Sequence, residues 1–289
     1  MESIAYLARQ PILNRDGKIF AYELLFRDSP TSDTAVIASD LLATAQVLEN
    51  VLNSIGIQNI VGTSKAFVNC SRNMLLNSMF KLLNPKYFVL EVLEDVDVDG
   101  DVVDAIQKYK AQGFEIAIDD FIFNSQFIDR FEPLFPYVNY IKMDVVENSP
   151  EDMEKAATFF KAKDIKLLAE KVEDEETFKR CAAAGYDLFQ GFFFARPELV
   201  TGEKIDATSS AIWRLLKLLR ERTTFDDFCK VLENSTEVAA NLLKFVNADS
   251  QTHCHVNNVK DAVAWVGMRH MQEWLMLMLY ARRPEKPQR

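Results

Sequence analysis

The sequence is poor in glycine, with 9 glycines among 289 residues, whereas an average protein contains about 7% glycine. It contains neither G-x-G-x-x-G nor G-x-x-x-x-G-K-[ST], the patterns in which glycine-rich loops bind phosphate groups. The common nucleotide-binding loops are therefore excluded. The apolar share of 48% also excludes a disordered chain and a collagen-like chain.

Cysteine pairs and long apolar runs are missing as well. The four cysteines are spread along the chain and none forms a C-x-x-C motif, which is typical of a reducing compartment. The N-terminus lacks a charged region followed by a long apolar core, so it does not predict a signal peptide. No segment reaches about 18 uninterrupted apolar residues. We therefore expect a cytoplasmic protein that does not insert into a membrane.

Basic residues are outnumbered, with 33 Lys and Arg against 43 Asp and Glu, a net charge of −10. This balance argues against a protein that binds a nucleic-acid polymer, which needs a basic face. An anionic substrate would be repelled unless a bound metal reversed the local field. The excess of acidic residues lies in residues 1–200, which contain 20 basic and 32 acidic side chains. Residues 201–289 contain 13 basic and 11 acidic side chains.

The chain also changes character near residue 200. Before this point short β-rich runs alternate with helical stretches, and after it three long segments with helical periodicity follow one another. We therefore expect an α/β domain over residues 1–200 and a small all-α domain over residues 201–289. The segment PELVTGEKID, residues 197–206, is interpreted as the linker.

Within the first domain, short apolar runs recur every 20 to 28 residues, and each ends in a polar residue. These end residues are Asn69, Glu91, Asp119, Lys142, Glu170 and Gln190. The spacing fits one strand and one crossover helix per unit, which indicates a parallel sheet covered by helices. Six units in about 200 residues favour a closed, TIM-like (β/α) barrel. The chemistry of such barrels lies at the carboxyl ends of the strands.

Most of these end residues carry oxygen ligands, and Glu23 and Asp120 extend the set. Carboxylate and amide oxygens select Mg²⁺ or Mn²⁺ rather than Zn²⁺. Acids crowded at one barrel mouth would raise one another's pKa unless one or two divalent ions neutralised them. A two-metal site can activate a water and hold a phosphodiester for in-line attack. Lys142 would supply a fixed positive charge nearby.

The ordered motifs RQPI, YELLFR, FVNCS, LEVLE, IDDF, IKMD, LAEKVE and LFQGFFFARP resemble the EAL domain family over about residues 4–198. The resemblance implies a barrel phosphodiesterase that hydrolyses cyclic di-GMP to linear pGpG with Mg²⁺ or Mn²⁺, two ions if it is active. It implies metal ligands at Glu23, Asn69, Glu91, Asp119, Asp120, Glu170 and Gln190. It also implies catalytic roles for Lys142, Glu170 and Asp120, contacts to the dinucleotide from Gln10 and Arg27, and a loop-supporting role for Glu94.

The sequence departs from this family in three places. The naming triplet is Glu23-Leu24-Leu25, and Lys171 replaces the glycine that follows the A-E pair. After Asp120 the family loop D-F-G-T-G is replaced by Phe121-Ile122-Phe123-Asn124. Because both loop glycines are gone, we expect a different loop backbone, and activity that is reduced or conditional. The Phe121 to Phe123 cluster could serve packing or a protein contact.

Residues 201–281 resemble the first part of an HDOD domain, through ANLLKFVN and VKDAVAWVGMRHMQEWLMLMLYA. The chain contains no His-Asp dipeptide, so metal-dependent HD chemistry is not expected. The apolar stripe of the last segment favours core packing over a groove for a partner.

Two hypotheses about the function follow from the whole sequence. The first is a phosphodiesterase coupled to a helical signalling module, and the second is an inactive sensor or scaffold that acts by protein contact. The expected partners are cyclic di-GMP and a protein, bound through the helical domain or as a homodimer.

Overall fold

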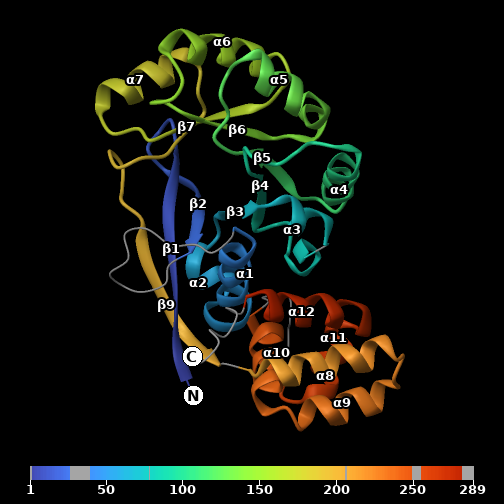
Figure 1. Ribbon diagram of the computed structural model, residues 1–289. Coiled ribbons are helices and arrows are strands. Elements are labelled where there is room, and N and C mark those ends of the chain that lie inside the picture. The colour runs from blue at the N-terminus through green and yellow to red at the C-terminus, as the bar shows by residue number, and fades with distance from the viewer. Residues whose placement is uncertain (1, 27–39, 78, 206, 249–254, 282–289) are drawn as a thin grey trace, which may run out of the picture.

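The computed structural model describes residues 2–26, 40–77, 79–205, 207–248 and 255–281, and its core is an eight-stranded barrel (Figure 1). Seven strands run parallel in chain order: β2 (Ile19–Phe26), β3 (Lys65–Cys70), β4 (Phe88–Val92), β5 (Glu115–Ile118), β6 (Tyr140–Asp144), β7 (Lys166–Glu170) and β8 (Leu188–Phe189). The first strand, β1 (Glu2–Asn14), pairs antiparallel with both β2 and β8 and closes the ring. The expected barrel is confirmed.

The antiparallel direction of β1 follows from the short turn that joins it to β2. Asn14 Oδ1 accepts hydrogen bonds from the backbone amides of Asp16 and Lys18, each 3.0 Å long. Gly17 has φ +71°, a conformation that favours glycine. A turn this short produces a hairpin. The barrel therefore has one antiparallel strand where the repeating unit predicted only parallel ones.

The predicted linker is instead a strand, β9 (Glu198–Ile205). It pairs antiparallel with the first half of β1, from Glu2 opposite Ile205 to Arg9 opposite Glu198. At 13 residues β1 is longer than its barrel neighbours, so its first half would present an unpaired edge without this cover. Residues 198–205 of the segment interpreted as the linker thus form a paired strand.

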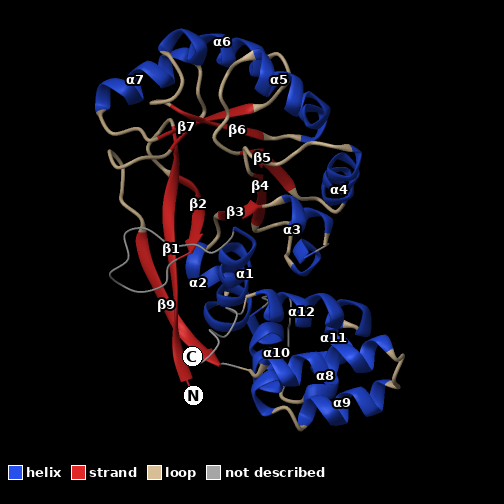
Figure 2. Cartoon of the chain, in the orientation of Figure 1, coloured by secondary structure: helices blue, strands red, loops and turns tan. Residues whose placement is uncertain are grey.

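Helices cover the outside of the barrel (Figure 2). Between the strands lie α1 (Asp40–Asn50), the π-helical η1 (Val51–Ile55), α2 (Ile57–Val61), α3 (Arg72–Leu76), η2 (Met79–Leu82), α4 (Gly100–Ala111), α5 (Ser125–Phe131), η3 (Glu132–Tyr137), α6 (Pro150–Lys161) and α7 (Glu175–Ala184). Ser149 caps the start of α6 by accepting a hydrogen bond from the amide of Asp152, and Pro150 occupies its first turn, where proline is favoured. Gly185 ends α7 with φ +113°.

The C-terminal part consists of α8 (Ser209–Arg220), α9 (Phe225–Glu233), α10 (Thr236–Ala248), α11 (Val259–Val266) and α12 (Met268–Tyr280). The three predicted helical segments form five helices. A break at Asn234 and Ser235 separates α9 from α10, and Gly267 at φ +80° separates α11 from α12. None of the helices in the described ranges combines the length and apolar character needed to cross a membrane.

The helices pack on one another and on the barrel (Figure 1). Trp274, Leu275 and Met278 of α12 are fully buried in the core of the helical part. Leu277 and Ala281, from the same end of the chain, belong to the core of the barrel. The indole Nε1 of Trp274 donates a 3.2 Å hydrogen bond to Asn53 Oδ1 in η1. Most of the apolar stripe thus serves packing, as expected.

Candidate active site at the mouth of the barrel

Alternation along the strands produces two stacked layers inside the barrel. The lower layer is apolar, and it consists of Ile12, Ala21, Phe67, Val89, Ala117, Tyr140, Leu168 and Leu188. Side chains two positions apart point to the same face of a strand. The next layer toward the mouth is therefore Gln10, Glu23, Asn69, Glu91, Asp119, Lys142, Glu170 and Gln190. Each of the eight strands, or the residue directly after it, supplies one member.

Most of this polar layer is buried. Glu91 and Lys142 are 0% and 1% exposed, and Glu23, Asp119, Glu170 and Gln190 also lie below 10%. Asn69 and Gln10 are half-buried. Gln10 lies directly opposite Glu23 in the antiparallel pair of β1 and β2. The structure therefore brings together the predicted residues from Gln10 to Gln190. The position of Arg27 lies outside the described residues.

Lys142 lies at the centre of four carboxylates. Its Nζ donates to Asp119 Oδ1 at 2.8 Å, and it lies 3.0 Å from Glu170 Oε1 and 3.8 Å from Glu23 Oε2. It also forms an ion pair with Glu91. Gln190 Nε2 donates a 2.6 Å hydrogen bond to Glu23 Oε2. A single buried cation thus links the carboxylates of β2, β4, β5 and β7.

The charges of this cluster perturb one another strongly. Burial favours the neutral amine of Lys142, but Asp119, Glu170, Glu23 and Glu91 outweigh it and raise its pKa well above the usual range. Burial, together with the neighbouring acids, raises the pKa of Glu91 and that of Glu170. Burial also acts to raise the pKa of Asp119, but Lys142 more than offsets this and holds it low. The neighbouring acids thus raise the pKa values of Glu91 and Glu170 in the predicted direction, but burial contributes more than they do.

Several buried oxygens of this layer remain without a hydrogen bond from the described residues. They are Asn69 Oδ1, Glu91 Oε2, Glu170 Oε2 and Gln190 Oε1. Unpaired buried acceptors are costly, and a divalent cation is a group that accepts such oxygens as ligands. The residues present therefore fit a Mg²⁺ or Mn²⁺ site.

A second acidic group adjoins the ring. Glu94, Asp119 and Asp120 each place one carboxylate oxygen within 4.8 Å of the others. Asp120 has φ +40°, a strained conformation for a residue other than glycine. Burial and the charge of Asp119 raise the pKa of Asp120. Glu94, predicted to support the loop, thus lies beside the paired aspartates.

The altered loop after Asp120 is anchored by Phe121, which points into the core between the barrel and its helices. Phe121 is fully buried, and its ring contacts Phe160 at 5.3 Å between centroids and Phe127 at 5.6 Å. Ile122 and Phe123 have ordinary negative φ angles. The backbone of this loop therefore does not require glycine at these two positions. Of the two readings of this cluster, packing is the one that the structure supports for Phe121.

Asn148 holds this loop in place and was not predicted. Its Nδ2 donates to the carbonyls of Phe121 and Asp144, each at 3.1 Å, and its Oδ1 accepts from the amide of Phe123 at 2.9 Å. Asn148 is 5% exposed. A buried amide that satisfies three backbone groups defines a single loop conformation. No periodicity distinguishes this asparagine from an ordinary loop residue.

Lys171 also has a role that the sequence did not reveal. It has φ +55°, the left-handed conformation that glycine would adopt most easily. Its ammonium forms an ion pair with Asp144, which is 2% exposed. The hydrogen bond that Lys171 donates to the Asp144 carboxylate raises the pKa of Lys171. The replacement of glycine by lysine therefore adds a positive charge at the rim, close to Asp120.

Two curated proteins are similar to this chain over almost its whole length. The chain is 27% identical over 278 residues to the uncharacterized protein YuxH of Bacillus subtilis, and covers 68% of its length. It is 26% identical over 280 residues to the cyclic di-GMP phosphodiesterase CdgJ of Vibrio cholerae, and covers 63% of its length. These matches include 95% and 94% of this chain. The chain thus spans about two thirds of the length of both relatives.

Solved structures show the same fold. BlrP1 of Klebsiella pneumoniae, in a complex with calcium and cyclic di-GMP, superposes with a TM-score of 0.54 and 20% identity, over 70% of this chain and 61% of that one. The FimX EAL domain of Xanthomonas citri, bound to cyclic di-GMP, superposes with a TM-score of 0.55 and 15% identity, over 67% and 88%. The model of the EAL domain family matches residues 5–197. The chain therefore belongs to the EAL domain family.

Proposed function

We propose that this protein is a metal-dependent phosphodiesterase that opens cyclic di-GMP to linear pGpG. The observation that carries the proposal is the inward-facing polar layer, in which buried carboxylate and amide oxygens surround Lys142. The similarity to CdgJ, whose name states this activity, supports the choice of substrate. So do the EAL structures that contain cyclic di-GMP.

The ions would be held by the oxygens of the ring and by Asp120. The proposed ligands are Glu23, Asn69, Glu91, Asp119, Asp120, Glu170 and Gln190. We propose two ions, Mg²⁺ or Mn²⁺, because seven oxygen-bearing side chains exceed what one six-coordinate ion needs. When bound, such ions lower the pKa of a water and polarise the phosphodiester.

The side chains of the protein would position the substrate and the protons. Lys142 keeps its positive charge at neutral pH, because its pKa is raised, so it can stabilise negative charge that develops on the phosphodiester. Glu170 and Asp120 have raised pKa values, which suits groups that exchange protons with the attacking water or the leaving oxygen. Gln10, beside Glu23, and Arg27 would contact the dinucleotide.

The direct test is to incubate the purified protein with cyclic di-GMP and either Mn²⁺ or Mg²⁺ and to separate the nucleotides by chromatography. We expect linear pGpG, and we expect Glu23→Ala to reduce its formation to background. Glu176→Ala, on the exposed start of α7, is the matched control and should remain active. Absence of turnover with both metals would refute catalysis. Calorimetric binding of cyclic di-GMP without turnover would then identify a sensor.

We further propose that residues 201–289 form an HDOD-like module that contacts another protein. Both curated relatives align over at least 94% of this chain, so the similarity includes the helical part. Pull-down with the full chain, compared with a variant that carries Phe225→Ala at the exposed start of α9, would show whether this surface binds a partner or a second copy.

A further inference from the structure

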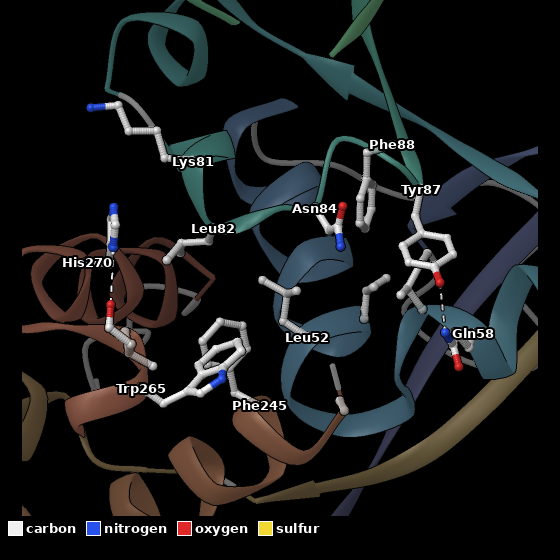
Figure 3. Close-up of a pocket in the computed structure, with 14 residues that line it drawn as sticks. Leu52, Gln58, Lys81, Leu82, Asn84, Tyr87, Phe88, Phe245, Trp265 and His270 are labelled. Carbon is white, nitrogen blue, oxygen red and sulfur yellow. Dashed lines mark hydrogen bonds between the residues drawn. The ribbon is translucent and has the colours of Figure 1, made fainter. Parts of the chain in front are cut away.

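A cavity lies away from the barrel mouth, between the barrel and the C-terminal helices (Figure 3). Its volume is about 250 Å³. The barrel side contributes Leu52 from η1, Leu82 from η2, and Tyr87 and Phe88 at the start of β4. The helical side contributes Phe245 of α10 and Trp265 of α11. Segments that are about 200 residues apart in the sequence thus form one pocket.

The walls of this pocket are largely aromatic. Trp265 and Phe245 lie together on the helical side, with ring centroids 6.4 Å apart and planes at 81° (Figure 3). Trp265 is 43% exposed, whereas Trp274 of the next helix is fully buried. The two tryptophans therefore have different roles, because Trp274 packs in the core whereas the indole of Trp265 lines the pocket. Flat aromatic walls favour a flat aromatic ligand.

Polar groups lie at the two ends of the pocket (Figure 3). At one end the Tyr87 hydroxyl and Gln58 Nε2 form a 2.8 Å hydrogen bond. At the other end are Lys81 and His270. The Lys81 ammonium is 3.6 Å from Glu273 Oε1 and remains partly exposed, and His270 Nδ1 donates to the Val266 carbonyl at 3.1 Å, which leaves Nε2 for another group.

The charge of the lining is opposite to that of the protein. The chain carries 43 acidic residues, but no Asp or Glu of the described residues lines this pocket, and one end of it holds Lys81 and His270. A ligand with one negative charge at this end would share the Lys81 ammonium with Glu273, which lies 3.6 Å from it, and would lie away from the acidic ring at the barrel mouth. A second anionic group would lie in the apolar centre without a partner.

We propose that this pocket binds a small planar aromatic monoanion of about two fused rings, such as an aromatic carboxylate. The size follows from the volume, because a cavity of roughly 150 Å³ holds benzene, and about 250 Å³ leaves room for a second ring. The rings would lie between Trp265, Phe245 and Leu52, and the carboxylate would face Lys81. This proposal is independent of phosphodiesterase activity.

The neighbouring backbone agrees with this assignment. Val51 and Leu52, which line the pocket, belong to the π-helical η1, and π-helical turns occur often at functional sites. Because both the barrel and the helices supply walls, a ligand that binds only the folded protein would stabilise the contact between them.

The test is calorimetric titration of the full chain with 2-naphthoate and with the neutral 2-naphthol. We expect 2-naphthoate to bind, and to bind more tightly than 2-naphthol. Trp265→Ala should weaken both by at least about tenfold. Trp213→Ala, a more exposed tryptophan outside the pocket, is the matched control and should change neither. Lys81→Gln should weaken 2-naphthoate alone.

Three results would overturn the proposal. They are the absence of 2-naphthoate binding up to its solubility limit, equal effects of Trp265→Ala and Trp213→Ala, and equal affinity for the charged and the neutral probe. Circular dichroism of each variant verifies folding. Lys81→Gln alters only a partly exposed side chain, so it still tests the site if Trp265→Ala does not fold.

Discussion

At the scale of single residues, Lys142 shows how strongly the surrounding charges can change the pKa of a buried side chain. It is 1% exposed, and a buried lysine alone would lose its charge. Four carboxylates around it reverse this effect and raise its pKa. The same lysine holds the pKa of Asp119 low, although burial opposes it. The site is therefore one coupled charge system, and the effect of removing one member cannot be assigned to that residue alone.

Gly191 is a residue whose replacement should be severe. It has φ +156°, and a Cβ there would lie 2.1 Å from the Val172 carbonyl oxygen and 2.4 Å from its amide nitrogen. Gly191→Ala must therefore displace backbone next to Gln190, and we expect a loss of about 3 kcal/mol or more in unfolding free energy. Gly17→Ala, at φ +71° in open space, should cost only about 1 kcal/mol. Urea denaturation measures both, and equal losses would contradict this account.

Asn148 should act as a positioning residue for the paired aspartates. Asn148→Ala removes three hydrogen bonds that hold the loop after Asp120, so we expect Mn²⁺ affinity to fall roughly 10- to 100-fold. Asn247→Ala is the matched control, because Asn247 likewise bonds the carbonyls of Leu243 and Val256 and the amide of Val256. The control should lose stability but retain its Mn²⁺ affinity by calorimetry. If both variants bind Mn²⁺ equally, Asn148 does not position the site.

At the scale of the elements, the two ends of the barrel differ in how their charged side chains are arranged. Lys65 and Glu115 lie at the starts of β3 and β5, where Lys65 Nζ is 2.7 Å from Glu115 Oε2 and the Tyr140 hydroxyl donates to the same oxygen at 2.8 Å. The polar layer lies at the opposite ends. The lower end of the barrel thus contains an ion pair, whereas the acidic side chains cluster at the upper end.

The pair at the lower end makes stability depend on pH. Burial acts to raise the pKa of Glu115, but Lys65 and Tyr140 outweigh it and lower that pKa. A lowered carboxyl pKa stabilises the fold above the unfolded value, about 4.3, and this contribution disappears as the pH falls through the folded value. We therefore expect Glu115→Gln to lower the unfolding free energy by about 1 kcal/mol at pH 7.

Urea denaturation at pH 7 and at pH 3 checks this expectation. The difference between the wild type and Glu115→Gln should shrink at the lower pH. Glu175→Gln removes an exposed pair with Lys179 on α7 and should have little effect at either pH. A difference for Glu115→Gln that stays constant between the two pH values would show that the charge of Glu115 is not its source.

At the scale of the whole molecule, the barrel and the helices share buried contacts. Leu277 and Ala281 lie in the barrel core, and Leu52 and Leu82 pack against the helical core. β9 leads from the barrel toward α8 along the edge of β1. Because apolar surface of each part is buried on the other, we expect one cooperative unfolding transition.

Trp274→Phe tests this contact. It keeps most of the buried ring but removes the hydrogen bond to Asn53 Oδ1, which leaves a buried acceptor unpaired. We expect a loss of about 1 to 3 kcal/mol, whereas Trp213→Phe on the exposed face of α8 should change stability by less than about 0.5 kcal/mol. Chemical denaturation followed by circular dichroism measures both. Two separate transitions in the wild type would contradict the shared core.

Much of the fold and of the site could be predicted from local pattern. The apolar runs that end at Asn69, Glu91 and Glu170 predicted the strands, and alternation then placed these side chains inside the barrel. Ser149 and Thr224 cap the starts of α6 and α9, and capping residues of this type can be recognised in a sequence. These features depend on residues close together in the sequence, so one chain suffices to read them.

Other features required the tertiary structure, since they depend on pairing between distant segments. The sequence determined which strands carry oxygen ligands, but only the closed barrel placed Lys142 among them. Pairing with β1, not local composition, made residues 198–205 a strand. The contacts of Asn148 and the pocket beside Trp265 likewise join segments far apart. Local patterns encode the direction of a side chain along its own strand or helix, whereas its partners are decided by packing.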